Sequence, residues 1–482
     1  MDSRKLHIAI LSSPGLGHLI PDLVLGNRLA THRDVKVTIL VITTSSSPAE
    51  SQILKAPFGP KLVDILEIPP VDISHLIDAN TKVVTQLRIM VREALPGVRS
   101  TIAGMEHRPD VFIGDLFCTE AFPIAIEFGM PKYVYVPSTA WFTALITYSP
   151  LLHEEVVGEY VDQTEPLKIP GCKPIRPEDV VDSMLDRNDQ QYREYIRQGT
   201  EFTLGDGILI NTWEDLEPIS LEGLRKNKYL HAVVKSPVYP IGPLRRVNEP
   251  AGQKSDLIKW LDMQPSKSVI FVSFGSAGTL SAQQITELAW GLELSKQRFI
   301  WVVRSPSKNG ADESFFTSGS SLDGEPDYLP EGFLTRTEKT GLVIQLWAQQ
   351  MEILSHPAIG GFLSHCGWNS ILESITSSVP MIAWPLYSEQ RLNATMLAEE
   401  IGVAVRPKVL PTKKVVDREE IGKMVRTVME YKEGKVMRDK VKQLKISAEN
   451  ALNMGGSSYN TMCNFLKDAE MRLRSLKSAS QK

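Results

Sequence analysis

Residues 6–42 read LHIAILSSPGLGHLIPDLVLGNRLATHRDVKVTILVI, and this stretch indicates the fold. Its two ends, 6–11 and 36–42, are apolar and rich in β-branched residues, as strands covered on both faces of a parallel sheet are. Between them a Pro-Gly loop leads into a helical pattern that ends near Leu29. The stretch is therefore predicted to be a strand–helix–strand unit of a parallel α/β sheet.

The same alternation continues along the chain and restarts in its second half. Further strands are predicted at 110–115, 132–137, 268–275, 298–304, 341–346, 360–365 and 379–385. The segment 235–254 contains four prolines, two glycines and several charges, a composition typical of a linker between domains. We expect two Rossmann-like, doubly wound parallel-sheet domains that face each other across a cleft, where α/β sheets place their ligands.

The composition excludes several classes of protein. A chain of 482 residues is too long for one hydrophobic core. A formal net charge of −4 argues against a nucleic-acid surface, and no apolar run is long enough for a signal peptide or a membrane span. The four cysteines are scattered and form no CxxC pair, so we expect reduced thiols and no zinc site. These features favour a cytoplasmic protein without a membrane anchor, whose partner is a small molecule.

The densest motif is WAQQMEILSHPAIGGFLSHCGWNSILESITSSVPMIAWPLYSEQ, residues 347–390. The strand GGFLSH brings in His365, Gly367 is expected to form a tight turn, and Asn369 and Ser370 open a helix. Backbone N–H groups at a helix N-terminus, together with the helix dipole, form a site for an anionic phosphate. The motif therefore predicts a nucleotide phosphate site.

Other residues near this motif suit the rest of a nucleotide. Glu373 lies four residues after Asn369, on the same helix face, where a carboxylate can bind the two ribose hydroxyls. Trp347 offers a flat surface for a base, and Ser276 lies on a second loop after a strand. There is no Lys or Arg in residues 347–390 and no Asp-x-Asp pair in the chain, so amides, hydroxyls and the helix dipole are expected to stabilise the diphosphate without a metal ion.

A candidate general base follows the first strand. His18 lies in SSPGLGH, where Gly15 and Gly17 lack the third glycine of a dinucleotide fingerprint because position 20 is Ile. Asp115 ends another predicted strand and would reach His18 if both strands lie at the switch point of the sheet. A carboxylate on the far ring nitrogen fixes the histidine tautomer and stabilises the imidazolium. An apolar acceptor pocket is expected from aromatic and apolar neighbours, namely Phe117, Trp141, Phe142, Leu386 and Tyr387.

Residues 347–390 resemble the signature of plant UDP-dependent glycosyltransferases, whose two-domain fold is called GT-B. The positions that fit are Trp347, Gln350, His356, Gly361, Phe362, Ser364, His365, Cys366, Gly367, Trp368, Asn369, Ser370, Glu373, Val379, Pro380, Pro385, Glu389 and Gln390. The start, SSPGLGHLIP, and the FGS loop fit as well, so the similarity covers nearly the whole chain. Two positions depart from the family pattern: Gln349 stands where the family usually has proline, and Ser378 where it usually has glycine.

The resemblance implies a role for each donor-site residue. Trp347 would stack on uracil and Ala348 would pair with it through its backbone. Gln350 and Glu373 would bind the ribose. The phosphates would lie against Ser276, His365, Asn369 and Ser370, in the turn that contains Gly367. The sugar would be held by Trp368, Glu389 and Gln390, and a glutamine at the last position is associated with glucose donors.

The resemblance also implies the reaction and the domain plan. We expect an inverting, metal-independent O-glucosyltransferase that uses UDP-glucose as co-substrate and no cofactor, with His18 as base and Asp115 as its orienter. The sequence is similar to those of the group that glucosylates hydroquinone, monolignols and related simple phenolics. Hydroxycoumarins and flavonoids are further candidate acceptors. The expected plan is an acceptor-binding domain 1–245, a linker 246–254, a UDP-sugar-binding domain 255–456, and a C-terminal helix at 457–482 that packs back on the first domain of a monomer.

Two other functions stay open. The first is a Rossmann-type NAD(P)-dependent oxidoreductase, which would need the GxGxxG motif that is missing here. The second is a UDP-sugar-binding protein without catalytic activity, which would not require His18, Asp115, Glu389 and Gln390 together.

Overall fold

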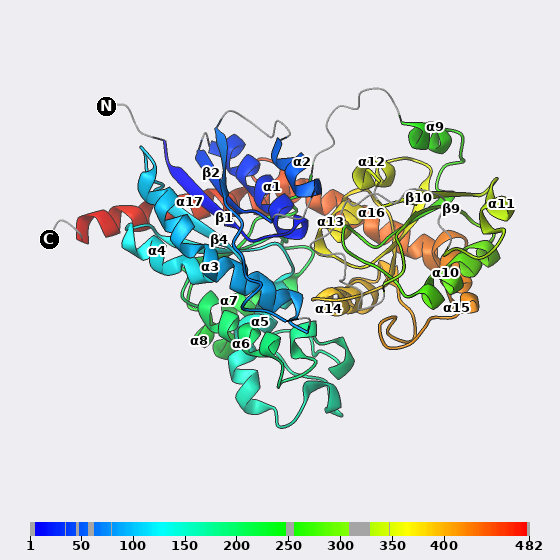
Figure 1. Ribbon diagram of the computed structural model, residues 1–482, viewed down its shortest axis with the longest axis horizontal. Helices are drawn as coiled ribbons and strands as arrows, with labels where there is room; N and C mark the ends of the chain where they lie inside the picture. Colours follow the sequence, from blue (N-terminus) through cyan, green and yellow to red (C-terminus); the bar gives the residue numbers. More distant parts are fainter. Residues whose placement is uncertain are drawn as a thin grey trace. The chain divides into compact units, whose positions relative to one another are not determined.

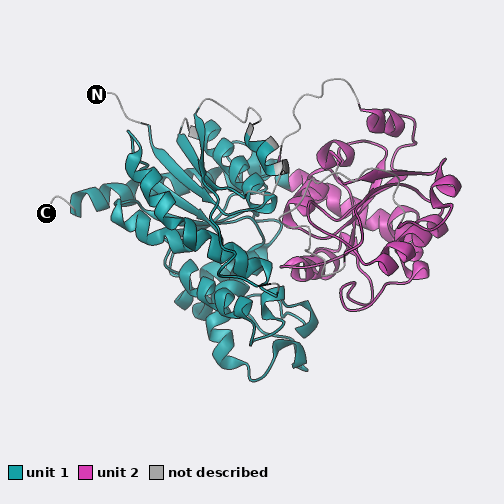
Figure 2. Cartoon of the chain, viewed as in Figure 1, with its two compact units in different colours: residues 1–244, 448–482 teal, residues 245–447 magenta. Residues whose placement is uncertain are grey.

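The computed structural model describes residues 5–33, 35–44, 48–55, 62–78, 80–246, 255–307, 328–346 and 348–479. The chain forms two compact domains, shown in different colours in Figure 2. The first domain contains residues 1–244 and 448–482, and the second contains residues 245–447. The second domain therefore ends before the boundary at 456 that was expected from the sequence, because residues 448–456 associate with the first domain.

The first domain is built on a seven-stranded parallel sheet with the order β3-β2-β1-β4-β5-β6-β7. Three neighbouring strands of this sheet, β2, β1 and β4, are labelled in Figure 1. Its strands are β1 His7–Ser12, β2 Lys36–Ile42, β3 Val63–Ile68, β4 Val111–Asp115, β5 Lys132–Val136, β6 Gly207–Ile210 and β7 Val238–Pro240. The strand order reverses between β1 and β4, so the loops after these two strands diverge and leave a ligand-binding position between them.

The second domain repeats this plan with a six-stranded parallel sheet in the order β10-β9-β8-β11-β12-β13. Its strands are β8 Val269–Ser273, β9 Arg298–Val303, β10 Gly341–Gln345, β11 Ile359–Ser364, β12 Met381–Ala383 and β13 Ala404–Val405. The order reverses between β8 and β11, which places a second switch point in this domain.

Helices accompany both sheets, as expected of doubly wound folds. Those of the first domain are α1 Leu16–Arg33, α2 Pro48–Lys55, α3 Val83–Gly104, α4 Phe122–Glu127, α5 Ala140–Glu155, α6 Gln190–Phe202, α7 Pro218–Lys226, α8 Lys228–Val233 and α17 Ser457–Ala479. Those of the second are α9 Asp256–Asp262, α10 Ala282–Ser295, α11 Phe333–Thr337, α12 Gln350–Leu354, α13 Trp368–Thr376, α14 Gln390–Thr395 and α15 Arg418–Met429. Helix α16, Lys432–Leu452, spans the boundary between the domains. No helix within the described ranges is long and apolar enough to cross a membrane.

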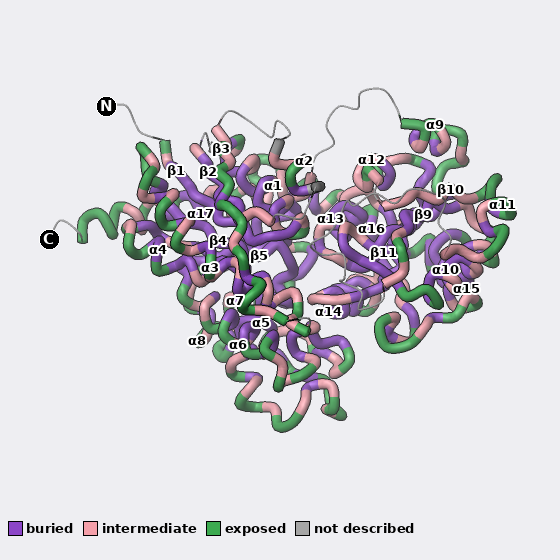
Figure 3. The backbone as a smooth tube through the Cα atoms, viewed as in Figure 1, coloured by how far each residue is buried: buried purple, intermediate pink, exposed green. Residues whose placement is uncertain are grey.

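The central strands are buried along their length (Figure 3). Each domain has a cluster of buried apolar side chains from its sheet and helices, which includes Ile10 and Ile113 in the first and Val272 and Leu363 in the second. Burial on both faces explains why these strands appear in the sequence as unbroken apolar runs.

The C-terminal helix α17 packs on the sheet of the first domain. The ring of Phe465 lies 4.9 Å from the ring of Tyr133 and 5.7 Å from that of Tyr239, in edge-on geometry. The hydroxyl of Tyr133 donates a hydrogen bond to Asp468, at 2.8 Å. The helix thus completes the apolar core of the first domain although it lies at the other end of the chain.

The prediction of two parallel α/β sheets is confirmed, and each predicted strand is present. Four strands were missed: β3, β6, β7 and β13. The interpretation of the whole segment 235–254 as linker was wrong in its first part, because Val238–Pro240 forms β7 at the edge of the sheet. An edge position tolerates a proline, since one side of the strand needs no hydrogen-bonding partner. Residues 247–254 of the expected linker lie outside the described residues.

Candidate active site

His18 and Asp115 lie together at the switch point of the first sheet. β1 and β4 are neighbours, with Leu11 opposite Gly114, so the chain leaves both strands at the same edge. Asp115 is the last residue of β4, and His18 lies in the first turn of α1, just after β1. The Nδ1 atom of His18 is 3.1 Å from Oδ2 of Asp115. The two side chains thus have the contact that the sequence predicts.

The surroundings of Asp115 fix the orientation of the pair. Its side chain is fully buried and also accepts a hydrogen bond from the hydroxyl of Ser13. Gly15, with φ of 103°, turns the chain after β1 so that the first turn of α1 can begin. Because Nδ1 of His18 faces the carboxylate, Nε2 is the nitrogen that would take a proton from a substrate.

The aromatic residues expected in the acceptor pocket differ in their placement. The ring centroid of Phe117 lies 5.0 Å from that of His18, so Phe117 adjoins the proposed base. Trp141 and Phe142 lie in the first turn of α5 and are buried. The carboxylate of Glu217 accepts hydrogen bonds from the backbone N–H groups of Ala140 and Trp141, and so caps this helix. Phe117 is therefore the candidate with a direct link to the base.

In the second domain, the loops after β8 and β11 meet around His365. A Cβ atom on Gly275 would lie 2.5 Å from the His365 ring, and one on Gly367 would lie 2.4 Å from its Nε2 atom. Any side chain at these two positions would overlap the His365 ring, so the close approach of both loops requires glycine. The tight turn lies at Cys366, with φ of 67°, and not at Gly367 as expected. Gly367 has an ordinary φ of −63° and precedes α13.

Arg304, at the end of β9, was not found by sequence reasoning. Its guanidinium donates hydrogen bonds to the carbonyls of Gly275 at 2.6 Å, Gly278 at 3.2 Å and Leu346 at 2.9 Å. It thus joins the loop after β8 to the turn before Trp347. Burial and the nearby charge of Arg304 lower the pKa of His365 to about 3. His365 is therefore neutral near pH 7 and can contribute a hydrogen bond, but no charge, to a phosphate.

Three of the predicted donor-site residues form a hydrogen-bonded group. The side-chain amide of Gln350, on α12, donates to the hydroxyl of Ser370 at 2.9 Å and to the carboxylate of Glu373 at 2.7 Å. Ser370 and Glu373 lie on α13, as does Asn369. Burial raises the pKa of Glu373, while the hydrogen bond from Gln350 and the charges of Arg245 and Arg246 lower it. These hydrogen bonds join α12 to α13.

The pair Glu389–Gln390 lies at the start of α14. The side-chain oxygen of Gln390 accepts hydrogen bonds from the backbone of Leu386 at 2.9 Å and of Tyr387 at 3.1 Å. Asn393 donates to Glu389 at 3.4 Å and to the carbonyl of Cys366 at 3.0 Å, which ties this loop to the turn before α13.

Three predicted contact residues are less accessible than expected. Leu386 belongs to the hydrophobic core of the second domain, so its side chain is not a surface for an acceptor. Tyr387 is half-buried and packs against that core. Trp368, expected to hold the sugar, is 3% exposed.

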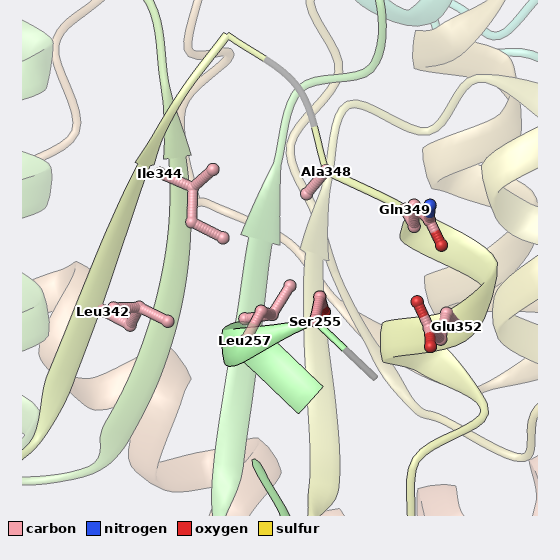
Figure 4. Close-up of a pocket in the computed structure, with 7 residues that line it drawn as sticks. All are labelled: Ser255, Leu257, Leu342, Ile344, Ala348, Gln349 and Glu352. Atoms are coloured by element: carbon pink, nitrogen blue, oxygen red, sulfur yellow. The ribbon is translucent and has the colours of Figure 1, made fainter. Parts of the chain in front are cut away.

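The expected uracil-binding segment is described only in part. Trp347 lies outside the described residues. Ala348, next to it, borders a cavity of about 350 Å³, shown in Figure 4. The cavity lies between α9, β10 and the start of α12, and it is lined by Ser255, Leu257, Leu342, Ile344, Ala348, Gln349 and Glu352. None of the predicted phosphate ligands lines it, so the cavity is distinct from the phosphate site.

The contact between Gly367 and His365 gives a testable prediction. Gly367→Ala would force the His365 ring out of place, because the added Cβ has no room. Loss of one hydrogen bond to a charged phosphate is expected to weaken UDP binding by about 10–100-fold. Isothermal titration with UDP measures this. Gly104→Ala is the matched control, since its Cβ meets nothing within 4 Å. Unchanged UDP affinity in Gly367→Ala would mean that His365 does not contact the nucleotide.

Known proteins resemble this chain over nearly its whole length. The family described as "UDP-glucoronosyl and UDP-glucosyl transferase" matches residues 244–440. Anthocyanidin 3-O-glucosyltransferase 5 of Manihot esculenta is 55% identical over 460 residues, which are 95% of this chain and 94% of that protein. Hydroquinone glucosyltransferase of Rauvolfia serpentina is 42% identical over 461 residues, 95% of this chain and 96% of that protein.

A solved structure shows the same fold. The crystal structure of TcCGT1 in complex with UDP matches with a TM-score of 0.92 and 47% identity, and the match covers 97% of this chain and 100% of that one. The two parallel-sheet domains are therefore those of the GT-B fold. Since curated relatives well above 30% identity cover almost the entire chain, the chain belongs to the family of plant UDP-glycosyltransferases.

Proposed function

We propose that this protein transfers glucose from UDP-glucose to a hydroxyl group of a small phenolic acceptor, with inversion at C1, to give a β-glucoside. The observation that carries the proposal is the His18–Asp115 pair, 3.1 Å apart at the switch point of the first sheet. A hydroxyl nucleophile needs a general base, and a histidine held by a buried carboxylate has the geometry of one. In the other domain, the family donor signature supplies the nucleotide site.

The reaction would be a single displacement. The acceptor oxygen attacks C1 of glucose while its proton moves to Nε2 of His18, and the bond between C1 and the UDP oxygen breaks. A phenol has a pKa near 10 and a free histidine near 6.5, so complete proton transfer before attack would cost roughly 5 kcal/mol. Proton transfer therefore accompanies formation of the C–O bond, and Asp115 stabilises the imidazolium that results.

The departing UDP would be stabilised by neutral donors and the dipole of α13. Its diphosphate would accept hydrogen bonds from Ser276, His365, Asn369 and Ser370, with the N-terminus of the nine-residue helix α13 pointing at it. Arg304 adds one positive charge beside His365. These residues require no metal ion for the charge on the leaving group.

The rest of the donor would be held as the family pattern implies. Gln350 and Glu373, which are hydrogen-bonded to each other, suit the two ribose hydroxyls. Trp347 and Ala348 would hold uracil, and Glu389 with Gln390 would bind the hydroxyls of glucose. Since the side-chain oxygen of Gln390 accepts from the backbone, its amide nitrogen is the group that would face the sugar.

The relatives support a phenolic acceptor. Two similar proteins are named for anthocyanidin and hydroquinone, which both carry phenolic hydroxyl groups. The ring of Phe117 beside His18 offers an apolar surface on which a flat ring could lie. Simple phenols, monolignols, hydroxycoumarins and flavonoids form the acceptor set to test.

The test is an assay of the purified protein with UDP-glucose and this set of phenols, in which glucosides are detected by mass spectrometry. A phenol glucoside formed in the presence of a chelator supports the proposal. UDP binding without any product would favour the UDP-sugar-binding alternative, and oxidation of the substrate with NAD(P) would favour the oxidoreductase. The monomeric state and the cytoplasmic location stay predictions, which gel filtration and a fluorescent fusion would check.

A further inference from the structure

Asp22 is a buried carboxyl group beside the proposed base, and the mechanism above does not use it. It lies four residues after His18 on α1, so the two side chains share one helix face, with Cβ atoms about 5–6 Å apart. The Asp22 side chain is fully buried. Within the described part of the chain, no hydrogen bond of good geometry satisfies either of its carboxyl oxygens. An ionised carboxylate in such a place is costly, which favours the neutral acid.

The groups around Asp22 come from three other elements. Burial raises the pKa of Asp22 well above its usual range, the charge of Asp115 on β4 raises it further, and the Ser12 hydroxyl lowers it in part. Cys118 follows β4 and Tyr135 lies on β5. Burial and the charges of Asp115 and Asp22 raise the pKa of both. The titratable groups around Asp22 are thus Asp115, Cys118 and Tyr135, together with His18 on its own helix. Asp115 is a second carboxyl within electrostatic range of Asp22.

We propose that Asp22 and Asp115 together hold one negative charge for His18: Asp22 is a positioning residue that stays neutral while Asp115 is charged, and takes over the charge when Asp115 is neutral. The inference rests on the proposed role of His18 as base. Two ionised carboxylates in one buried site would repel each other, as in carboxyl pairs that share a proton. One negative charge is enough to stabilise the imidazolium that forms during the reaction.

The first test measures stability and does not depend on activity. Thermal unfolding is followed from pH 5 to pH 8 for the parent, Asp22→Asn, Asp115→Asn and the double variant. Above about pH 4 the unfolded chain releases the Asp22 proton while the folded chain keeps it, so the parent loses stability as the pH rises. Asparagine has no proton to lose. Asp22→Asn is therefore expected to raise the melting temperature by an increment that grows by about 2–4 °C per pH unit.

The comparison between backgrounds decides the role of Asp115. The rise in melting temperature caused by Asp22→Asn is expected to be smaller in the Asp115→Asn background. The charge of Asp115, which together with burial keeps Asp22 neutral, is absent there. Asp72→Asn is the matched control, since Asp72 is exposed and hydrogen bonds from Ser74 lower its pKa, so its replacement gives no gain that grows with pH. An Asp22→Asn increment that does not change with pH, or is equal in both backgrounds, would overturn the proposal. Asp22→Leu serves as a second uncharged variant if Asp22→Asn does not fold.

The second test measures kcat/KM for glucoside formation with the same four proteins. The loss caused by Asp22→Asn is expected to be at least about tenfold larger in the Asp115→Asn background than in the parent, because there Asp22 carries the charge that His18 needs. An equal loss in both backgrounds would mean that Asp22 contributes packing alone and would overturn the proposal. If the parent forms no glucoside, the proposed function fails, and the stability measurements alone decide the charge state of Asp22.

Discussion

Replacing His18 by alanine is expected to lower kcat/KM for phenol glucosides by about 10²–10⁴-fold, the usual contribution of a general base. The imidazole is the group positioned by Asp115 to take the acceptor proton, and alanine leaves no group to do so. The affinity for UDP should stay unchanged, since the predicted donor residues lie in the second domain. Initial rates by mass spectrometry and titration with UDP separate these two effects.

His75→Ala is the matched control for this variant. His75 is an exposed histidine in the same domain, and its replacement should leave kcat/KM within about twofold of the parent, as for most surface substitutions. A second readout is the pKa of the acceptor. A phenol of lower pKa loses its proton more easily without a base, so its kcat/KM should fall less in His18→Ala. Equal rates for His18→Ala and His75→Ala would show that another group, or none, removes the proton.

Replacing Arg88 by methionine is expected to destabilise the first domain by about 3–5 kcal/mol, because it removes a fully buried counter-charge. The carboxylates around it would keep only the partly exposed Arg92 and Arg197 as partners. Arg88 lies on α3 and its side chain is fully buried. Its guanidinium is 2.7 Å from Glu120, 2.7 Å from Glu201 and 3.5 Å from Glu194. Thermal or denaturant unfolding, followed by circular dichroism, measures the loss.

Arg88 also supports the loop that carries the aromatic neighbour of the base. It donates hydrogen bonds to the carbonyl of Phe117 at 3.3 Å and to the hydroxyl of Thr119 at 3.2 Å. Arg88→Met is therefore expected to raise KM for the acceptor at temperatures where the variant is still folded. Arg88→Lys keeps the charge but loses the planar guanidinium that contacts several carboxylates at once. It should therefore be more stable than Arg88→Met but less stable than the parent.

Arg99→Met is the matched control for stability, since Arg99 lies on the same helix and pairs with one carboxylate, Glu127, at the surface. Exposed pairs of this kind are worth about 0.2–1 kcal/mol. A loss in Arg88→Met as small as that in Arg99→Met would mean that the buried cluster adds nothing to the free energy of unfolding.

The strands that could be predicted from the sequence are those whose burial requires a largely apolar run of residues. Strands such as β1 and β8 are covered on both faces, so most of their residues are apolar and the run is easily recognised. β3 lies at the edge of its sheet and reads VDILEI, with exposed residues along it, and β13 is two residues long. A weakly buried or very short strand lacks the signal on which the prediction depends.

The candidate site was predictable where a motif keeps its residues close in sequence. His365, Asn369, Ser370 and Glu373 lie on one loop and helix, and the structure places them there. Arg304, Arg88 and Asp22 left no such signal. Each acquires its role from elements distant in sequence, as when Arg304 on β9 joins two loops of other strands.

The placement of side chains relative to the core was the harder problem. Leu386 was expected to line the acceptor pocket because it lies beside the sugar-binding pair, yet its side chain belongs to the hydrophobic core of the second domain. A motif gives the order of residues along a loop, but packing decides which side of the loop each one faces. The turn at Cys366 is a similar case, because a residue other than glycine takes the positive φ.

The most direct test of the central claim is the anomeric configuration of the product. The purified protein is incubated with UDP-glucose and hydroquinone, and the glucoside is examined by proton NMR of its anomeric hydrogen. A single displacement gives hydroquinone β-glucoside together with one UDP per glucose transferred, and this is the expected result. An α-glucoside would contradict the single displacement, and the absence of any glucoside across the whole set of phenols, despite UDP binding, would contradict the proposed activity itself.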